Sequence, residues 1–107
     1  MSLTDRTEPT DVALNTDLYE LTMAQGFFEA GLADTRACFS VFFRDNPFDG
    51  GYAVACGTGQ IADLVESYRY DADSIEYLRS LVAPGGGPMF TEAFLDYLAD
   101  FRMRVSV

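Results

Sequence analysis

The sequence predicts an α/β fold of the α+β kind: one helix, two short strands forming a hairpin or a sheet edge, then three helices. Two observations favour this architecture. Apolar residues recur at helical spacing in four stretches, whereas residues 36–44 are apolar at nearly every position over the length of a strand. The 107 residues suffice for one small domain, and 49% apolar content excludes a disordered chain. We expect residues 1–10 to be a disordered lead and residues 11–107 to be the domain.

The first helix is expected to begin after Asp17, a favourable N-cap, with Glu20 three residues later as its capping-box partner. Gly31 suits the position that follows the last turn. Two apolar stripes run along the helix, which predicts burial on more than one side. The first stripe comprises Leu14, Leu18, Leu21, Gln25, Phe28 and Leu32, and the second comprises Met23, Phe27 and Ala30.

The strand region follows this helix. Both faces of residues 36–44 are largely apolar, which predicts an interior strand. Residues 46–51 are rich in turn-forming types, and residues 52–56 are typical of a second strand, so a hairpin is expected. Cys38 and Cys56 lie in these apolar runs without a C-x-x-C motif, and we expect two buried, reduced thiols.

Three further helices are expected. Asp73 is the predicted N-cap of the second of these three helices, with Glu76 as its capping-box partner. Thr91 is the predicted N-cap of the third. Residues 103–107 alternate weakly and indicate the start of a strand. The residues expected to face inward are Ile61, Leu64, Val65 and Tyr68, then Ile75, Leu78 and Val82, and finally Phe94, Leu98 and Phe101.

Charge and composition exclude several classes of function. The net charge of −10 repels phosphate backbones and anionic lipid surfaces, so neither nucleic acid nor a membrane is an expected partner. The absence of histidine excludes a Ser-His-Asp triad, a histidine general base and most zinc sites. No apolar run reaches the length of a membrane span, and the polar residues 1–11 do not resemble a signal peptide. We expect a soluble cytoplasmic protein.

Three local patterns invite a ligand interpretation and have a simpler alternative. Residues 57–62 match the G-x-G-x-x-A form of the dinucleotide fingerprint, but a capped helix follows instead of a second parallel strand, which favours a tight turn. The glycines at residues 85–87 lack the following Gly-Lys-Ser/Thr of a phosphate-binding loop. Asp71, Asp73 and Glu76 suit a helix entry better than a metal site, and we expect no metal site.

Two side chains are candidates for recognition. Tyr19 lies in the first turn of the first helix, where an aromatic residue usually belongs to the core. Arg44 lies at the end of the predicted interior strand. Its structural alternative is a salt bridge to Asp45, Asp49 or Asp17.

Three blocks of the sequence, in order and at the expected spacing, resemble the nicotinate phosphoribosyltransferase family. They are TDLYELTM at residues 16–23, FFRDNPF at residues 42–48 and AFLDYL at residues 93–98. The resemblance covers residues 11–101, and residues 102–107 fit the family less well.

The resemblance implies an enzyme of NAD salvage. Such enzymes transfer a phosphoribosyl group from phosphoribosyl pyrophosphate to nicotinate, giving nicotinate mononucleotide and pyrophosphate, with ATP hydrolysis and Mg²⁺. The family joins an N-terminal α/β domain to an irregular α/β barrel and forms a homodimer with sites shared between subunits. The resemblance implies that Tyr19 stacks on the pyridine ring, that Arg44 binds phosphate, and that Asp17 orients one of them.

The family's barrel, which carries the catalytic residues, would lie beyond Val107. We therefore expect this chain to be a truncated N-terminal domain with no catalytic residue and no bound cofactor, inactive by itself. The alternative is a non-catalytic dimerisation or interaction module, because a helix that is apolar on two sides has more apolar surface than so small a fold can cover.

Overall fold

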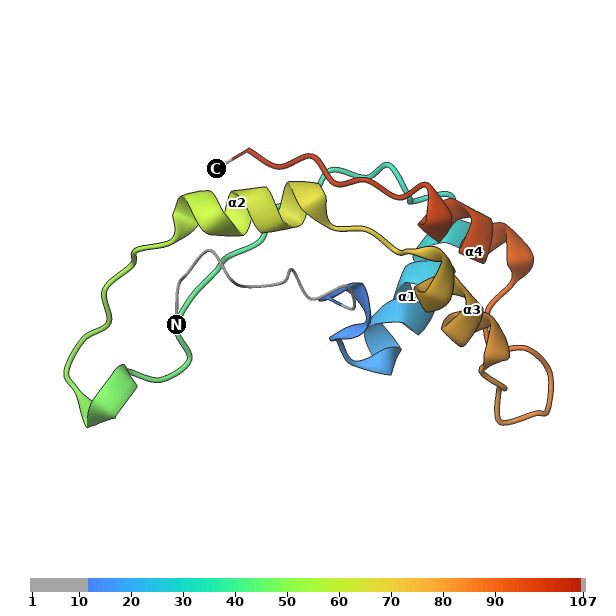
Figure 1. The fold of residues 1–107 in the computed structure, drawn as a ribbon, viewed down its shortest axis with the longest axis horizontal. Helices are drawn as coiled ribbons and strands as arrows, with labels where there is room; N and C mark the ends of the chain where they lie inside the picture. The colour runs from blue at the N-terminus through green and yellow to red at the C-terminus, as the bar shows by residue number, and fades with distance from the viewer. Residues whose placement is uncertain (1–11, 107) are drawn as a thin grey trace.

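The computed structural model describes residues 12–106 and contains four α-helices within them (Figure 1). These are α1 (Leu18–Glu29), α2 (Thr58–Ser67), α3 (Ala72–Ser80) and α4 (Glu92–Ala99), accompanied by the 3-10 turns η1 (Val12–Leu14) and η2 (Pro47–Asp49). Helices α1, α3 and α4 lie together, whereas α2 lies apart from them (Figure 1). All four expected helices are confirmed. The disordered lead expected at residues 1–10 lies outside the described residues.

Helix α1 begins and ends where the sequence indicates, but its N-terminus is not capped as expected. Asp17 is the N-cap, yet its carboxylate makes no capping hydrogen bond, and the Glu20 amide donates to the Asp17 carbonyl oxygen instead, at 3.0 Å. At the other end Gly31 adopts a φ of +77°, which glycine tolerates without steric cost. The Leu32 amide then donates to the Phe27 carbonyl at 2.9 Å, closing a Schellman motif.

Helices α3 and α4 are both capped by side chains. Asp71, rather than the expected Asp73, is the N-cap of α3, and its carboxylate accepts a 2.7 Å hydrogen bond from the Ser74 amide. The helix starts earlier than predicted because the chain leaves the buried Tyr70 in an extended conformation, which places Asp71 at the first turn. The Thr91 cap of α4 is confirmed, since its hydroxyl accepts the Phe94 amide at 3.2 Å.

The core lies where α1, α3 and α4 meet. Phe94 is fully buried and packs against the rings of Phe28 and Phe90, each with its centroid 5.8 Å away. Tyr97 stacks on the same cluster, 4.9 Å from Phe28. The buried apolar residues among those described are Ala13, Leu21, Tyr70, Ile75, Leu78, Phe90, Phe94, Leu95 and Leu98.

One polar side chain joins α1 to the chain that enters α4. The Gln25 side-chain nitrogen donates to the Met89 carbonyl at 3.1 Å, and its oxygen accepts the Thr91 amide at 2.8 Å. Gln25 belongs to the first apolar stripe of α1, so a half-buried amide takes the place of an apolar contact there.

The predicted strands are not formed. Within the described chain, residues 36–44 and 52–56 run as separate segments around an open loop that carries η2, and no hairpin joins them (Figure 1). Residues 103–106 form no strand either. An interior strand needs a hydrogen-bonding neighbour on each side, and none of the described segments lies in position to be one.

Several expected burials are also wrong. Cys38 and Cys56 are free but exposed, because the segments that carry them are unpaired. On the second face of α1, Met23 and Phe27 remain 52% and 51% exposed, so nothing described covers that face. Val82 is 61% exposed because the chain has already left α3 and forms an isolated antiparallel bridge to Pro88.

The molecule is extended for its size. Its radius of gyration is 16.8 Å, against about 13 Å for a compact domain of this length. Its accessible surface is 8967 Å², whereas a folded monomer of this mass exposes roughly 5,900 Å². Among the described residues, α1, α3 and α4 form the packed part, whereas residues 36–56 are largely exposed.

Candidate functional site

The start of α1 presents two of the three candidate residues together. Asp17 precedes the helix and Tyr19 follows one residue later, so the helix geometry alone brings them close. Tyr19 is 59% exposed, and its core alternative is therefore wrong. The Thr22 hydroxyl donates to the Tyr19 backbone carbonyl oxygen at 3.0 Å, so this bond belongs to the helix backbone and does not involve the phenol.

A shallow, open depression of about 400 Å³ lies beside this helix start. Its lining is almost entirely polar, and it includes Asp17, whose carboxylate makes no capping hydrogen bond. The residues that line it are Leu14, Asn15, Thr16, Asp17 and Glu20. Two carboxylates make this depression unsuited to an anion by itself, so any anionic ligand requires a cation from elsewhere.

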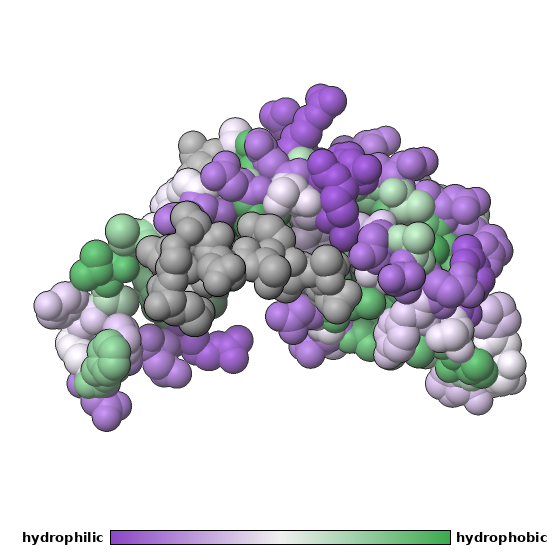
Figure 2. All heavy atoms as spheres, in the orientation of Figure 1, coloured by the Kyte–Doolittle hydropathy of each residue, from purple (hydrophilic) through white to green (hydrophobic). Residues whose placement is uncertain are grey.

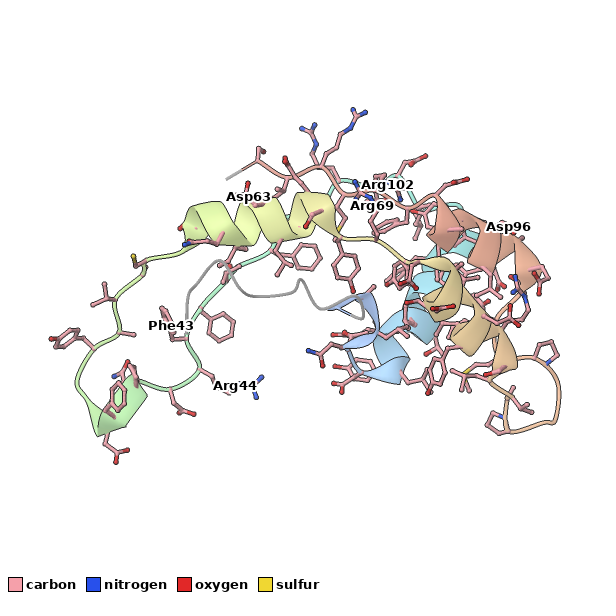
Figure 3. The ribbon with its side chains drawn as sticks, viewed as in Figure 1. Phe43, Arg44, Asp63, Arg69, Asp96 and Arg102 are labelled. Atoms are coloured by element: carbon pink, nitrogen blue, oxygen red, sulfur yellow. The ribbon has the colours of Figure 1, made fainter. Side chains whose placement is uncertain are left out.

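Arg44 supplies a cation but from a different part of the chain. It lies on the extended segment before η2, and in the view of Figure 3 its side chain extends to the right, away from the loop that carries η2. No ion pair joins it to Asp45, Asp49 or Asp17, so its salt-bridge alternative is wrong for these partners. The structure brings Asp17 and Tyr19 together and leaves Arg44 on a separate segment.

The acidic and basic groups of α3 and α4 have structural partners. Hydrogen bonding with Ser74, above all the bond that its backbone amide donates at 2.7 Å, lowers the pKa of Asp71 below its usual value. Arg79 bridges Glu92 of α4 and Glu76 of its own helix, and these hydrogen bonds raise the pKa of its guanidinium. Burial, together with the neighbouring Tyr68, raises the pKa of the Tyr70 phenol well above its usual value. The physical causes of these three shifts are helix capping, ion pairing and burial.

The metal and phosphate alternatives find no support. Within residues 12–106 no group of three or more His, Cys, Asp or Glu side chains could hold a metal ion. The glycine loop folds on itself, with the Gly86 amide donating to Ala83 and the Ala83 amide to Gly87, so neither is free for a phosphate. Gly57 is the N-cap of α2, and that helix leads into α3 rather than into the second parallel strand of a dinucleotide fold.

No helix among the described residues is both long enough and apolar enough to span a lipid bilayer.

Comparison with known proteins agrees with the three sequence blocks. A family model described as the nicotinate phosphoribosyltransferase (NAPRTase) N-terminal domain matches residues 14–107. The match extends to residue 107 and so includes residues 102–107. The chain therefore belongs to the nicotinate phosphoribosyltransferase family.

Individual relatives carry the same name. A nicotinate phosphoribosyltransferase of Mycobacterium tuberculosis is 38% identical over 90 residues, which is 84% of this chain and 18% of that protein. The human protein is 38% identical over 79 residues, 74% of this chain and 15% of that protein. The Bacillus subtilis protein is 34% identical over 68 residues, 64% of this chain and 14% of that protein.

This chain spans less than a fifth of the length of these curated relatives. No solved structure matches it significantly.

The feature that sequence reasoning missed is the exposed apolar surface on residues 36–56. The signal was present, since a segment that is apolar on both faces must be covered on both faces. We expected other parts of the domain to cover this apolar surface, but no described part of the chain does so.

Proposed function

We propose that this chain is the N-terminal part of an enzyme that transfers a phosphoribosyl group to nicotinate. The observation that carries the proposal is the family match over residues 14–107, within which Tyr19 and Arg44 are exposed side chains. In the reaction the pyridine nitrogen bonds to the ribose C1 atom, the bond from C1 to pyrophosphate breaks, and pyrophosphate leaves with the bonding electron pair.

Tyr19 binds the nicotinate ring in this proposal. An aromatic face half exposed at a helix start offers offset stacking, which contributes about 0.5–1.5 kcal/mol beyond area burial. Stacking places the ring without engaging its nitrogen, which stays free to attack. Asp17 lies beside it and orients Tyr19 or Arg44.

Arg44 binds phosphate. A guanidinium forms paired hydrogen bonds to phosphate oxygens, which an ammonium cannot do. Because the chain carries a net charge of −10, both the nicotinate carboxylate and the phosphoribosyl donor are repelled at long range. A local cation such as Arg44 is therefore needed to hold the donor.

The remaining groups of the reaction come from elsewhere. The described residues offer no ligand set for Mg²⁺, and we assign neither ATP nor Mg²⁺ a site in this chain. The proposal includes a cytoplasmic homodimer in which Tyr19 and Arg44 complete a site of the neighbouring subunit. It assigns no catalytic residue to these 107 residues, so the chain alone is expected to be inactive.

A chimera tests the assignment of the two residues. The matching region of this chain replaces its counterpart in the Mycobacterium tuberculosis relative, and steady-state kinetics are measured with both substrates. We expect Tyr19→Ala to raise KM for nicotinate about 2- to 12-fold, the equivalent of the lost stacking. We expect Arg44→Ala to raise KM for the phosphoribosyl donor roughly 10- to 100-fold, since charged hydrogen bonds are lost.

Met23→Ala is the matched control, since Met23 is a half-exposed residue of the same helix. Unchanged kinetics in both Tyr19→Ala and Arg44→Ala would remove the site assignment.

A second candidate is a non-catalytic interaction module that pairs with itself or with a full-length subunit. The excess accessible surface of the chain favours it. Light scattering coupled to size-exclusion chromatography tests this candidate function. A monomer with no affinity for the full-length relative would contradict it.

A further inference from the structure

We propose that Gln25 is a positioning residue that sets the direction in which α1 presents Tyr19. The proposal rests on the proposed function, because it concerns the side chain that binds nicotinate there. It goes further by naming a residue that touches no substrate and by assigning to it an effect on the affinity for nicotinate.

The amide of Gln25 makes two hydrogen bonds to one short stretch of backbone. Its nitrogen donates to the Met89 carbonyl oxygen at 3.1 Å, and its oxygen accepts from the Thr91 amide at 2.8 Å. Only one of the two orientations of a side-chain amide places its donor against a carbonyl and its acceptor against an N–H. The two bonds together therefore fix the plane of the amide as well as its position.

The stretch of backbone that receives these bonds is itself held at three points. The Met89 amide donates to the carbonyl oxygen of Leu81, the C-cap of α3, at 3.1 Å. Phe90 is buried, and its ring lies 5.8 Å from that of Phe94. The Thr91 hydroxyl caps α4. The amide consequently ties α1 to a fixed part of the helical cluster and not to a free loop.

Helix α1 also packs on the cluster through apolar side chains. Leu21 is buried, and the ring of Phe28 lies 5.8 Å from Phe94 and 4.9 Å from Tyr97. Hydrophilic residues cover much of the surface around α3 and α4 in the view of Figure 2, and the buried apolar residues lie beneath them. Hydrophobic attraction has no direction, so these contacts hold α1 against the cluster without fixing its rotation about its own axis.

The hydrogen bonds of Gln25 supply the direction that the apolar contacts lack. Among the described residues, Gln25 is the side chain of α1 that makes hydrogen bonds beyond its own helix. The helix is continuous from Leu18 to Glu29, and Tyr19 lies about 9 Å from Gln25 along its axis. A continuous helix turns as one body, so fixing its rotation at one residue also fixes the direction of the Tyr19 ring.

The start of α1 has no comparable attachment. Asp17 makes no capping hydrogen bond, and Tyr19 is exposed. Before the helix, the Tyr68 hydroxyl donates to the Ala13 carbonyl at 2.9 Å. Residues 15–17 lie between that bond and α1 and are not helical, so the bond holds the approach to the helix and not its rotation.

Fluorescence reports the position of the helix start without any substrate. The chain contains no tryptophan, so Tyr19→Trp introduces a single indole whose anisotropy follows motion on the nanosecond timescale. The anisotropy is measured in the 107-residue chain with and without Gln25→Met, because methionine is unbranched and flexible and forms neither hydrogen bond. We expect Gln25→Met to lower it. Ile75→Val, which removes one buried methyl group from α3, controls for a general loss of stability and should leave it unchanged.

Kinetics in the chimera with the Mycobacterium tuberculosis relative test the consequence for nicotinate. Gln25→Met should raise KM for nicotinate by no more than the about 2- to 12-fold expected of Tyr19→Ala. The kcat and the KM for the phosphoribosyl donor should not change, because only the binding of the ring is lost. A general loss of stability would instead lower the apparent kcat and leave both KM values unchanged, which is the result expected of Ile75→Val.

The double variant separates an effect through Tyr19 from an independent one. Since Gln25 acts through Tyr19, adding Gln25→Met to Tyr19→Ala should raise KM for nicotinate no further. Increases that multiply in the double variant would overturn the proposal, because Gln25 would then act by another route.

An anisotropy that Gln25→Met leaves unchanged also overturns the proposal, while the proposed function stands. The same holds for an unchanged KM in Gln25→Met where Tyr19→Ala raises it. A fall in anisotropy with no change of KM in either variant supports the positioning of Tyr19 and contradicts its role in the proposed function. If the unsubstituted chimera transfers no phosphoribosyl group, the anisotropy alone decides whether Gln25 positions Tyr19.

Discussion

Two regions of this molecule have similar aromatic content and opposite fates. In the helical cluster, formed by α1 and residues 68–101, Phe90 and Phe94 are buried and Phe28 packs against them. In residues 36–56, here called the apolar arm, Phe39 and Phe42 are 86% and 75% exposed. Hydrophobicity alone therefore does not decide burial in this chain. The difference lies in where each region finds its partner.

The backbone hydrogen bonds of the helical cluster are made over short distances in sequence, although α1 reaches α4 through side chains far apart in the chain. Each helix forms its own backbone hydrogen bonds, and α3 packs directly on α4, which follows it after one loop. A strand cannot do this, because its hydrogen bonds belong to a neighbouring strand. The arm is consequently left open, while the cluster closes.

The sharpest test of this contrast removes one ring from each region. Phe94→Ala should cost about 3–5 kcal/mol of unfolding free energy, because it empties a fully buried site, whereas Phe39→Ala should change it by less than about 0.5 kcal/mol. Urea titrations followed by far-UV circular dichroism measure both. Equal losses of unfolding free energy in the two variants would show that the arm is packed in solution and would contradict the contrast between the two regions.

A smaller effect is expected from the polar contact that holds α1 to the cluster. Gln25→Ala removes the donor to the Met89 carbonyl and the acceptor of the Thr91 amide. The free energy of unfolding should fall by roughly 1–3 kcal/mol. Gln60→Ala, on the exposed α2, is the matched control and should be nearly neutral. Comparable midpoints for the two variants would show that water replaces the Gln25 contacts.

The cap of α4 should contribute less again. Thr91→Ala removes the acceptor of the Phe94 amide and should cost about 0.5–2 kcal/mol, while Thr91→Ser keeps the hydroxyl and should stay close to the parent. Thermal unfolding of the three proteins gives the difference. A serine variant as unstable as the alanine variant would point to lost methyl packing instead of a lost cap.

The smallest expected effect is a pH dependence that arises from Asp71. Its pKa is lowered in the folded chain, so its contribution to stability is present above the unfolded value of about 3.9 and is lost as the pH falls through the folded value. Melting temperatures measured from neutral to acidic pH should fall less steeply in Asp71→Asn than in the parent. Parallel curves would show that other carboxylates cause the acid loss.

Much of the helical cluster could be predicted because its signals are local. As the sequence predicts, α1 ends just before Gly31 and Thr91 caps α4. Ile75 and Leu78 are buried, as their spacing indicates. The start of α3 was misplaced by two residues because Asp71 and Asp73 are both good caps, and only the packing of Tyr70 distinguishes them.

The candidate site was predictable only in part. That Tyr19 lies at the start of a helix follows from the pattern around Asp17, and the structure adds its exposure. The position of Arg44 relative to Tyr19 could not be derived, because it depends on the path of residues 36–56. The roles of Tyr19, Arg44 and Asp17 remain predictions that the chimera tests.

The sequence by itself determined the family, the four helices and the apolar character of residues 36–44. Family blocks, helix periodicity and caps depend only on residues that are close together in the sequence. Only the tertiary structure decided that the apolar arm stays uncovered, that Cys38 and Cys56 are exposed, and that Asp71 begins α3. The physical reason is the range of the interactions. A helix completes its hydrogen bonds within itself, whereas a strand and an apolar face require a partner whose presence local sequence does not specify.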